Sequence, residues 1–217
     1  MSRVRVGVLV SGGGTNLQAL LDDAARPDHP GEIAVVLSNR PDAYALQRAA
    51  AAGVPTEVLS HKGYADRASY DADLVATLRR YDVSWVCLAG FMRLLTRTFL
   101  DAFPGRVLNI HPALLPAFPG THAQRQALQT GVRLAGATVH LVDEGTDTGP
   151  ILAQGVVPVL PDDTEDTLSA RILGVEHQLY PRVLRWACAG RIALDGRQAR
   201  LDLPAGEQAW LLGQGFR

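Results

Sequence analysis

Short apolar runs alternate with amphipathic stretches along the first half of the chain. Strands are expected in four brief runs of apolar or β-branched residues, at 4–10, 33–37, 57–59 and 83–89. Helices are expected between them, after the Gly-rich turn at 11–16, over the alanine-rich 43–52, and over 70–81 where apolar residues recur at helical spacing. Such alternation indicates βαβ units, a parallel sheet and right-handed crossovers.

The pattern changes beyond Arg106. The prolines within 112–119 exclude regular helix there, and the short loop 143–149 favours antiparallel pairing of the strands on either side of it. Asp163 is expected to cap a long helix. The elements expected here are a strand at 107–110, a helix at 121–129, strands at 135–142 and 151–159, a helix with an apolar stripe from Leu168 to Trp186, and a hairpin of strands at 191–194 and 199–203.

These elements predict one α/β domain over residues 1–217. Its expected architecture is a Rossmann-like open twisted sheet, mostly parallel with an antiparallel C-terminal portion, and helices on both faces. The sequence shows no internal repeat or low-complexity tract that would argue for a second domain.

Composition narrows the function. The chain is 47% hydrophobic and 20% charged, with a net charge of −1, which argues against nucleic-acid binding through overall basicity. An anionic ligand must therefore be caught locally. No stretch approaches the roughly 20 apolar residues of a membrane span, and the chain starts directly with a strand-like run, so a reducing cytoplasm is expected.

Cysteine usage excludes two kinds of stabilised fold. Cys87 and Cys188 are the two cysteines and lie far apart, so neither a disulfide framework nor a zinc knuckle is expected. Cys87 stands in an apolar run and is expected to be an inert buried thiol.

The turn at 11–16 joins the first strand to the first helix. Unpaired amides and the helix dipole favour an anion at such a point, and glycines let the backbone curl around it. No lysine follows the glycines, and Leu17 stands where a dinucleotide fingerprint has its third glycine. Two interpretations remain: a tight turn capped by Thr15, or a cradle for a phosphate monoester.

Asn109 and His111 stand two residues apart at the end of a predicted strand, so their side chains are expected on one face. Pro112 keeps His111 extended. Open α/β sheets bind ligands at this edge. A carboxamide and an imidazole aimed together could donate to one oxygen, which suits an oxyanion formed at an attacked carbonyl.

A carboxylate nearby would hold the imidazole in its cationic form. Asp143 and Asp147 in the following loop are both candidates, and either could simply be a turn carboxylate. No metal site is expected, because the other histidines lack metal-ligand spacing; they are His29, His61, His122, His140 and His177.

Five motifs now occur together in one order. They are Gly14-Thr15-Asn16-Leu17, Leu88-Ala89-Gly90-Phe91-Met92-Arg93, Asn109-Ile110-His111-Pro112, Leu114-Leu115-Pro116-x-Phe118-Pro119-Gly120 and Asp143…Asp147-x-Gly149. Together they resemble the phosphoribosylglycinamide formyltransferase family, from Val4 to about Gly190. The Asn-x-His-Pro…Asp core is shared by formyltransferases in general, whereas the Gly-Thr-Asn turn and compact length point to this branch.

The resemblance implies a cytoplasmic enzyme of purine biosynthesis. It would transfer the formyl group of 10-formyltetrahydrofolate to the amine of glycinamide ribonucleotide, through a tetrahedral intermediate and without a metal. Asn109, His111 and Asp147 would be catalytic, and the family register selects Asp147 over Asp143. The partners implied are these two small molecules, with no nucleic acid and no membrane, and the chain would be a monomer or homodimer.

The resemblance also divides the chain and places its ligands. Residues 1–105 would be the phosphate-binding mononucleotide half, 106–190 the catalytic and folate-binding half, and 191–217 a hairpin and tail. The phosphate would lie at Gly14, Thr15 and Asn16, and the ribose at Glu176. The folate residues implied are Arg67, Met92, Arg93, Leu94, Leu95, His140, Val142 and Asp143.

Some of these positions allow another interpretation. Glu176 lies within the apolar stripe of the last long helix, where a carboxylate needs a partner, so an internal ion pair is the alternative to a ribose ligand. Arg67 could be a solvated helix arginine, and His140 a strand residue bonded to the sheet.

Two other functions stay open. One is a different user of formyltetrahydrofolate: a methionyl-tRNA or sugar-nucleotide formyltransferase, or a formyltetrahydrofolate hydrolase. The tRNA enzyme would need a basic surface, which the net charge does not suggest. The other is a non-catalytic phosphoester-binding module, which would leave Asn109, His111 and Asp147 together by coincidence.

Overall fold

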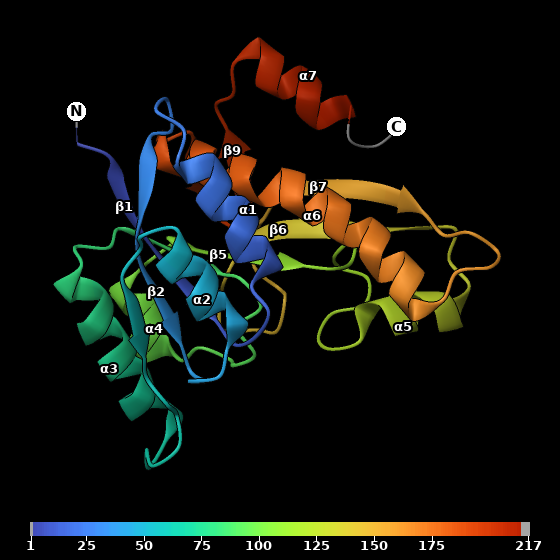
Figure 1. Ribbon diagram of the computed structural model, residues 1–217. Coiled ribbons are helices and arrows are strands. Elements are labelled where there is room, and N and C mark those ends of the chain that lie inside the picture. The colour runs from blue at the N-terminus through green and yellow to red at the C-terminus, as the bar shows by residue number, and fades with distance from the viewer. Residues whose placement is uncertain (1, 214–217) are drawn as a thin grey trace.

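The computed structural model describes residues 2–213. Its main sheet has seven strands in the order β3-β2-β1-β4-β5-β6-β7 (Figure 1). The strands are β1 (Val4–Val10), β2 (Gly31–Ser38), β3 (Thr56–Val58), β4 (Trp85–Leu88), β5 (Val107–His111), β6 (Leu134–Leu141) and β7 (Ile151–Pro158). The first five pair in parallel and β6 and β7 pair antiparallel, which confirms the predicted fold class.

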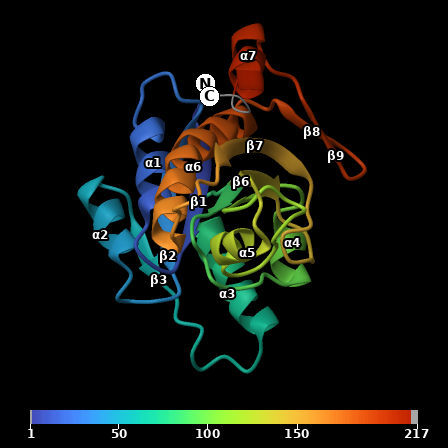
Figure 2. The same ribbon diagram turned by 90° about the vertical axis from the view of Figure 1, so that its right-hand side faces the viewer.

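Helices cover both faces of this sheet, as Figures 1 and 2 show from two sides. One face packs against α1 (Thr15–Ala24), α2 (Tyr44–Ala51), α5 (Ala123–Thr130) and α6 (Glu165–Cys188). The other packs against α3 (Arg67–Arg80) and α4 (Arg97–Ala102). A hairpin of β8 (Ile192–Asp195) and β9 (Gln198–Leu201) follows, and α7 (Ala205–Gly213) ends the described chain.

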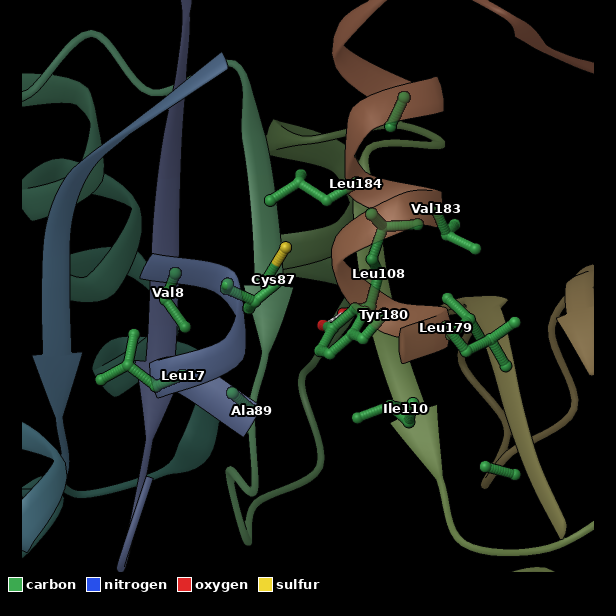
Figure 3. Close-up of a cluster of buried hydrophobic side chains, with 14 of the residues drawn as sticks. Val8, Leu17, Cys87, Ala89, Leu108, Ile110, Leu179, Tyr180, Val183 and Leu184 are labelled. Atoms are coloured by element: carbon green, nitrogen blue, oxygen red, sulfur yellow. Dashed lines mark hydrogen bonds between the residues drawn. The ribbon is translucent and has the colours of Figure 1, made fainter. Parts of the chain in front are cut away.

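Alternation along β5 decides which side chains reach the core and which reach the ligand edge. Leu108 and Ile110 enter the apolar cluster beneath α6, which Figure 3 shows together with Tyr180. Val107 enters the cluster beneath α3 and α4. Asn109 and His111 therefore share the Val107 side of the sheet, as the spacing predicts.

Tyr180 secures the sheet immediately below that edge. This fully buried side chain places its hydroxyl 3.0 Å from the carbonyl oxygens of both Leu88 and Leu108. These carbonyls belong to neighbouring parallel strands, so one hydroxyl bridges β4 and β5 next to Asn109. Cys87 lies in the same cluster, where burial raises the pKa of its thiol far above the ordinary value.

Some local expectations were wrong. Neither α4 nor α7 was predicted. Helix α4 lies between β4 and β5 but has only six residues, and α7 follows the hairpin at the end of the described chain. The cap of α6 is Thr164, whose hydroxyl accepts from the Thr167 amide. Asp163 instead accepts hydrogen bonds from Arg171 and from the Thr167 hydroxyl.

Gly14 is the glycine of the first turn that the fold requires. It has φ 73°, and an added Cβ would lie 2.6 Å from Cβ of Ala45 on α2. Gly14→Ala is expected to lower the free energy of unfolding by about 1–3 kcal/mol, because it adds left-handed strain to a steric clash. Urea denaturation measures the change.

Gly12→Ala is the matched control, because a Cβ there meets nothing within 4 Å. The variant should unfold nearly as the parent protein does. Equal losses in both variants would contradict the argument from close packing.

Candidate active site

The side chains of Asn109, His111 and His140 converge on Asp147. Nδ1 of His111 lies 3.3 Å from one carboxylate oxygen of Asp147. Nδ2 of Asn109 lies 3.5 Å from the other carboxylate oxygen and 3.1 Å from Nε2 of His140. His140 pairs directly opposite Asn109 on β6, so the antiparallel register brings it into the group. The three predicted catalytic residues lie together, with His140 as a fourth member.

Both ring nitrogens of His111 face acceptors. Nε2 lies 2.8 Å from the Phe118 carbonyl oxygen, and Nδ1 faces the Asp147 carboxylate. A neutral imidazole carries one N–H, whereas an imidazolium carries two and can satisfy both acceptors. The surroundings therefore suit the protonated ring. A substrate oxygen that approaches Nε2 has to displace the Phe118 carbonyl.

Asp147 is held by several donors in a strained backbone conformation. Its φ is 56°, its side chain is 12% exposed, and it accepts the Gly120 amide at 2.7 Å. Burial acts to raise the pKa of this carboxyl, but hydrogen bonds from His140 and the Gly120 amide, with the charge of His111, hold the pKa below its ordinary value. The ionised carboxylate therefore stabilises the folded state at pH values above the ordinary pKa of an aspartate. That contribution is lost as the pH falls through the lower pKa of the folded state.

Asp143 has different contacts. Its Oδ1 accepts the Gly145 amide at 3.1 Å and the Thr148 hydroxyl at 2.6 Å, so it closes the loop on itself. Asp147 faces two histidines. The geometry thus separates two carboxylates that residue patterns alone left equivalent.

A pocket of about 100 Å³ opens beside Asn109 and Asp147. Its wall is apolar where Leu88 and Phe91 contribute, and its rim carries charge. Six of the residues expected to bind folate line it: Arg93, Leu94, Leu95, His140, Val142 and Asp143. The Arg93 guanidinium lies 5.1 Å from the centre of the Tyr70 ring, which orients this cation at the rim.

Two expected folate residues lie elsewhere. Met92 is 74% exposed and lines a second pocket, of about 450 Å³, which is formed with the Gly-rich turn. Met92 and Arg93 are neighbours in the chain, yet they line different pockets. Arg67 begins α3 and lines neither pocket.

The second pocket lies at the start of α1. The cap of this helix is Gly14, with no side-chain cap, and Thr15 is already helical, so the expected Thr15 cap is wrong. The first amides of a helix carry partial positive charge. The pocket wall includes the three residues expected to bind phosphate: Gly14, Thr15 and Asn16.

Asn16 links this turn to α6. Its Nδ2 donates to Oε2 of Glu176 at 2.7 Å, and its own Oδ1 is buried and has no hydrogen-bond partner among residues 2–213. Glu176 is 6% exposed. Burial raises the pKa of this carboxyl, and the bond from Asn16 opposes the rise. Its partner is a neutral amide, so the described residues do not form the ion pair considered above.

Ser11 joins three parts of the wall of the second pocket. Its hydroxyl donates to Oδ1 of Asn39 at 2.7 Å and accepts the Met92 amide at 3.0 Å. The connections that follow β1, β2 and β4 therefore meet at one oxygen.

Comparisons with known proteins agree with this site. The family model described as "Formyl transferase" matches residues 4–184. The phosphoribosylglycinamide formyltransferase of Escherichia coli is 41% identical over 199 residues, which cover 92% of this chain and 94% of that protein. The chain is a member of the phosphoribosylglycinamide formyltransferase family. The resemblance seen in the five motifs is thereby confirmed.

Other relatives of this chain differ in length. The crystal structure of glycinamide ribonucleotide transformylase 1 from Symbiobacterium toebii has a TM-score of 0.90 and 52% identity, with 92% of this chain and 94% of that chain covered. The trifunctional purine biosynthetic protein adenosine-3 of Drosophila melanogaster is 51% identical over 185 residues. The match covers 84% of this chain but spans only 14% of that relative's length.

The candidate site also contains two groups that residue patterns missed. They are the Phe118 carbonyl and the Gly120 amide, both backbone groups of the proline-rich loop. Between residues 2 and 213, no cluster of three or more His, Cys, Asp or Glu side chains is arranged to hold a metal ion. No helix in that range has the length and apolarity to cross a membrane.

Proposed function

We propose that this formyltransferase transfers the formyl group of 10-formyltetrahydrofolate to the amine of glycinamide ribonucleotide. The observation that carries the proposal is the contact of Asp147 with His111 and Asn109, beside the pocket that Asn109 and Asp147 line. Family membership supports the same reaction. We also propose that the protein acts in the cytoplasm, whereas a monomeric or dimeric state stays a prediction.

The reaction begins when the substrate amine attacks the formyl carbon. A C–N bond forms, the carbonyl oxygen becomes an oxyanion, and a tetrahedral intermediate results. Asn109 Nδ2 and His111 Nε2 donate to this oxygen. His111 Nε2 has to give up its contact with the Phe118 carbonyl before it can do so. The bond to the folate nitrogen then breaks, and the proton lost by the amine passes to that nitrogen. Asp147 balances the imidazolium charge throughout.

The smaller pocket suits the formyl donor. Its apolar wall would accept a flat ring beside Asn109, and Arg93 at its rim would meet the carboxylates of the glutamate tail. Pockets for ligands of this size usually hold roughly 300–1,000 Å³. Because the present pocket is about 100 Å³, we expect the exposed part of the 143–149 loop to move outward when the donor binds.

The larger pocket suits the ribonucleotide. The amides at the start of α1 would bind the phosphate. Glu176 does not itself line this pocket, but it contacts Asn16, which does, and it would accept hydrogen bonds from the ribose hydroxyls. Asn16 joins the two subsites, since it stands in the turn and contacts Glu176.

Glu176→Gln separates the effect of this buried carboxylate on stability from its proposed role in ribose binding. Because burial raises the folded pKa, the ionised group opposes folding at neutral pH, so the variant is expected to be more stable at pH 7. The KM for the ribonucleotide is expected to rise roughly tenfold, because a charged acceptor is lost. Urea denaturation and steady-state kinetics measure both. An unchanged KM would return Glu176 to a structural role.

The proposed activity is tested with purified protein, both substrates, and neither metal nor ATP. The expected products are tetrahydrofolate and N-formylglycinamide ribonucleotide. Transfer to a different amine, or hydrolysis of the donor alone, would assign the chain to another formyltetrahydrofolate reaction. Binding of ribonucleotide without any turnover would favour the non-catalytic module.

A further inference from the structure

Helix α2 holds the Gly-rich turn from behind. The Ala45 amide donates to the Gly12 carbonyl at 3.0 Å. Nε of Arg48 donates to the Gly13 carbonyl at 2.9 Å. Two successive carbonyls of the turn are therefore directed at α2.

This arrangement fixes the direction of the following amides. In a trans peptide the C=O and N–H point in opposite directions, so the Gly13 and Gly14 amides point away from α2. Neither amide has an acceptor within the part of the chain that the structure describes. The 450 Å³ pocket lies on that far side, since its wall comes from the turn and from the connections after β2 and β4, without any α2 residue.

Arg48 is itself held in place. Its Nη1 donates to Oε1 of Gln18 at 3.2 Å, and its guanidinium lies 5.0 Å from the centre of the Tyr44 ring. The planar fork thus spans the turn and the first helix, which the single ammonium of a lysine cannot reproduce with the same geometry.

We propose that Arg48 is a positioning residue for the substrate phosphate. It keeps the Gly13–Gly14 peptide turned so that the Gly14 amide faces the phosphate pocket. The Ala45 amide does the same for the Gly13 amide, but it is part of the backbone and does not depend on a side chain. This inference rests on the proposed function, because the phosphate belongs to the proposed substrate.

The test compares two acceptors, glycinamide ribonucleotide and the corresponding riboside without phosphate. Arg48→Met is expected to raise the KM for the ribonucleotide roughly tenfold, with kcat nearly unchanged and kcat/KM for the riboside unaffected. Arg48→Lys keeps the charge and is expected to recover only part of the loss. Equal losses on both acceptors, an unchanged KM in Arg48→Met, or full recovery in Arg48→Lys would each overturn the proposal.

A second measurement does not depend on turnover. Inorganic phosphate is titrated into the protein while the amide NMR signals of Gly13 and Gly14 are followed. Both signals should shift in the parent protein, and the Gly14 shift should be lost in Arg48→Met. Thermal unfolding of Arg48→Met serves as the control that the variant is folded. A Gly14 shift that persists in Arg48→Met would overturn the role of Arg48 even if the proposed acceptor proved wrong.

Discussion

Asp147→Asn is expected to lower kcat by roughly 10²–10⁴-fold. The asparagine oxygen can still accept the Gly120 amide, so the loop should keep its shape. The neutral amide cannot balance the imidazolium of His111, which lies 3.3 Å from the present carboxylate. The variant therefore loses the negative charge beside His111 but keeps the conformation of the loop. The loss of activity should appear in kcat rather than in ribonucleotide affinity.

Steady-state kinetics with both substrates varied measures this effect. Glu144→Gln is the matched control, since Glu144 is in the same loop but pairs with the exposed Arg97. Its kcat should stay within a few-fold of the parent value. Normal turnover in Asp147→Asn would remove Asp147 from the mechanism.

Asn109→Ala is expected to lower kcat by roughly 10²–10³-fold, the usual cost of losing one oxyanion donor. The side chain is partly exposed and stands at the end of β5, so its removal should disturb the fold little. The donor pocket lies directly beside it, and the apolar wall of that pocket remains.

Rapid-quench measurement of a single turnover isolates the chemical step in Asn109→Ala. A slow chemical step with near-normal phosphate affinity is the expected result. If only KM changed, Asn109 would bind substrate equally in the ground and transition states, and the oxyanion role would be wrong.

Residue patterns predicted much of the fold because its strands bury both faces. The run Val4–Val10 became β1 with the same bounds, and period-two alternation correctly placed Asn109 and His111 on one side. Local propensity could not predict α4, which has only six residues and whose cap region is held by the distant Asp71.

The site was predicted less completely, and for a physical reason. Asp143 bonds within its own loop, whereas Asp147 contacts residues distant in the sequence, so their separation needed either the family register or the coordinates. The Phe118 carbonyl that contacts Nε2 of His111 is a backbone group. Its role therefore does not depend on the residue type and could not be predicted from the sequence. Met92 and Arg93 are neighbours in sequence, yet they line different pockets, which residue type alone does not reveal.

The Ser11 hydroxyl has a mechanical consequence. The hydroxyl joins the peptide of Met92 to the carboxamide of Asn39. A ligand that displaces either of these walls of the pocket therefore strains the same pair of hydrogen bonds. The two sides of this one pocket should therefore move together, so a ligand that displaces Met92 should also displace Asn39.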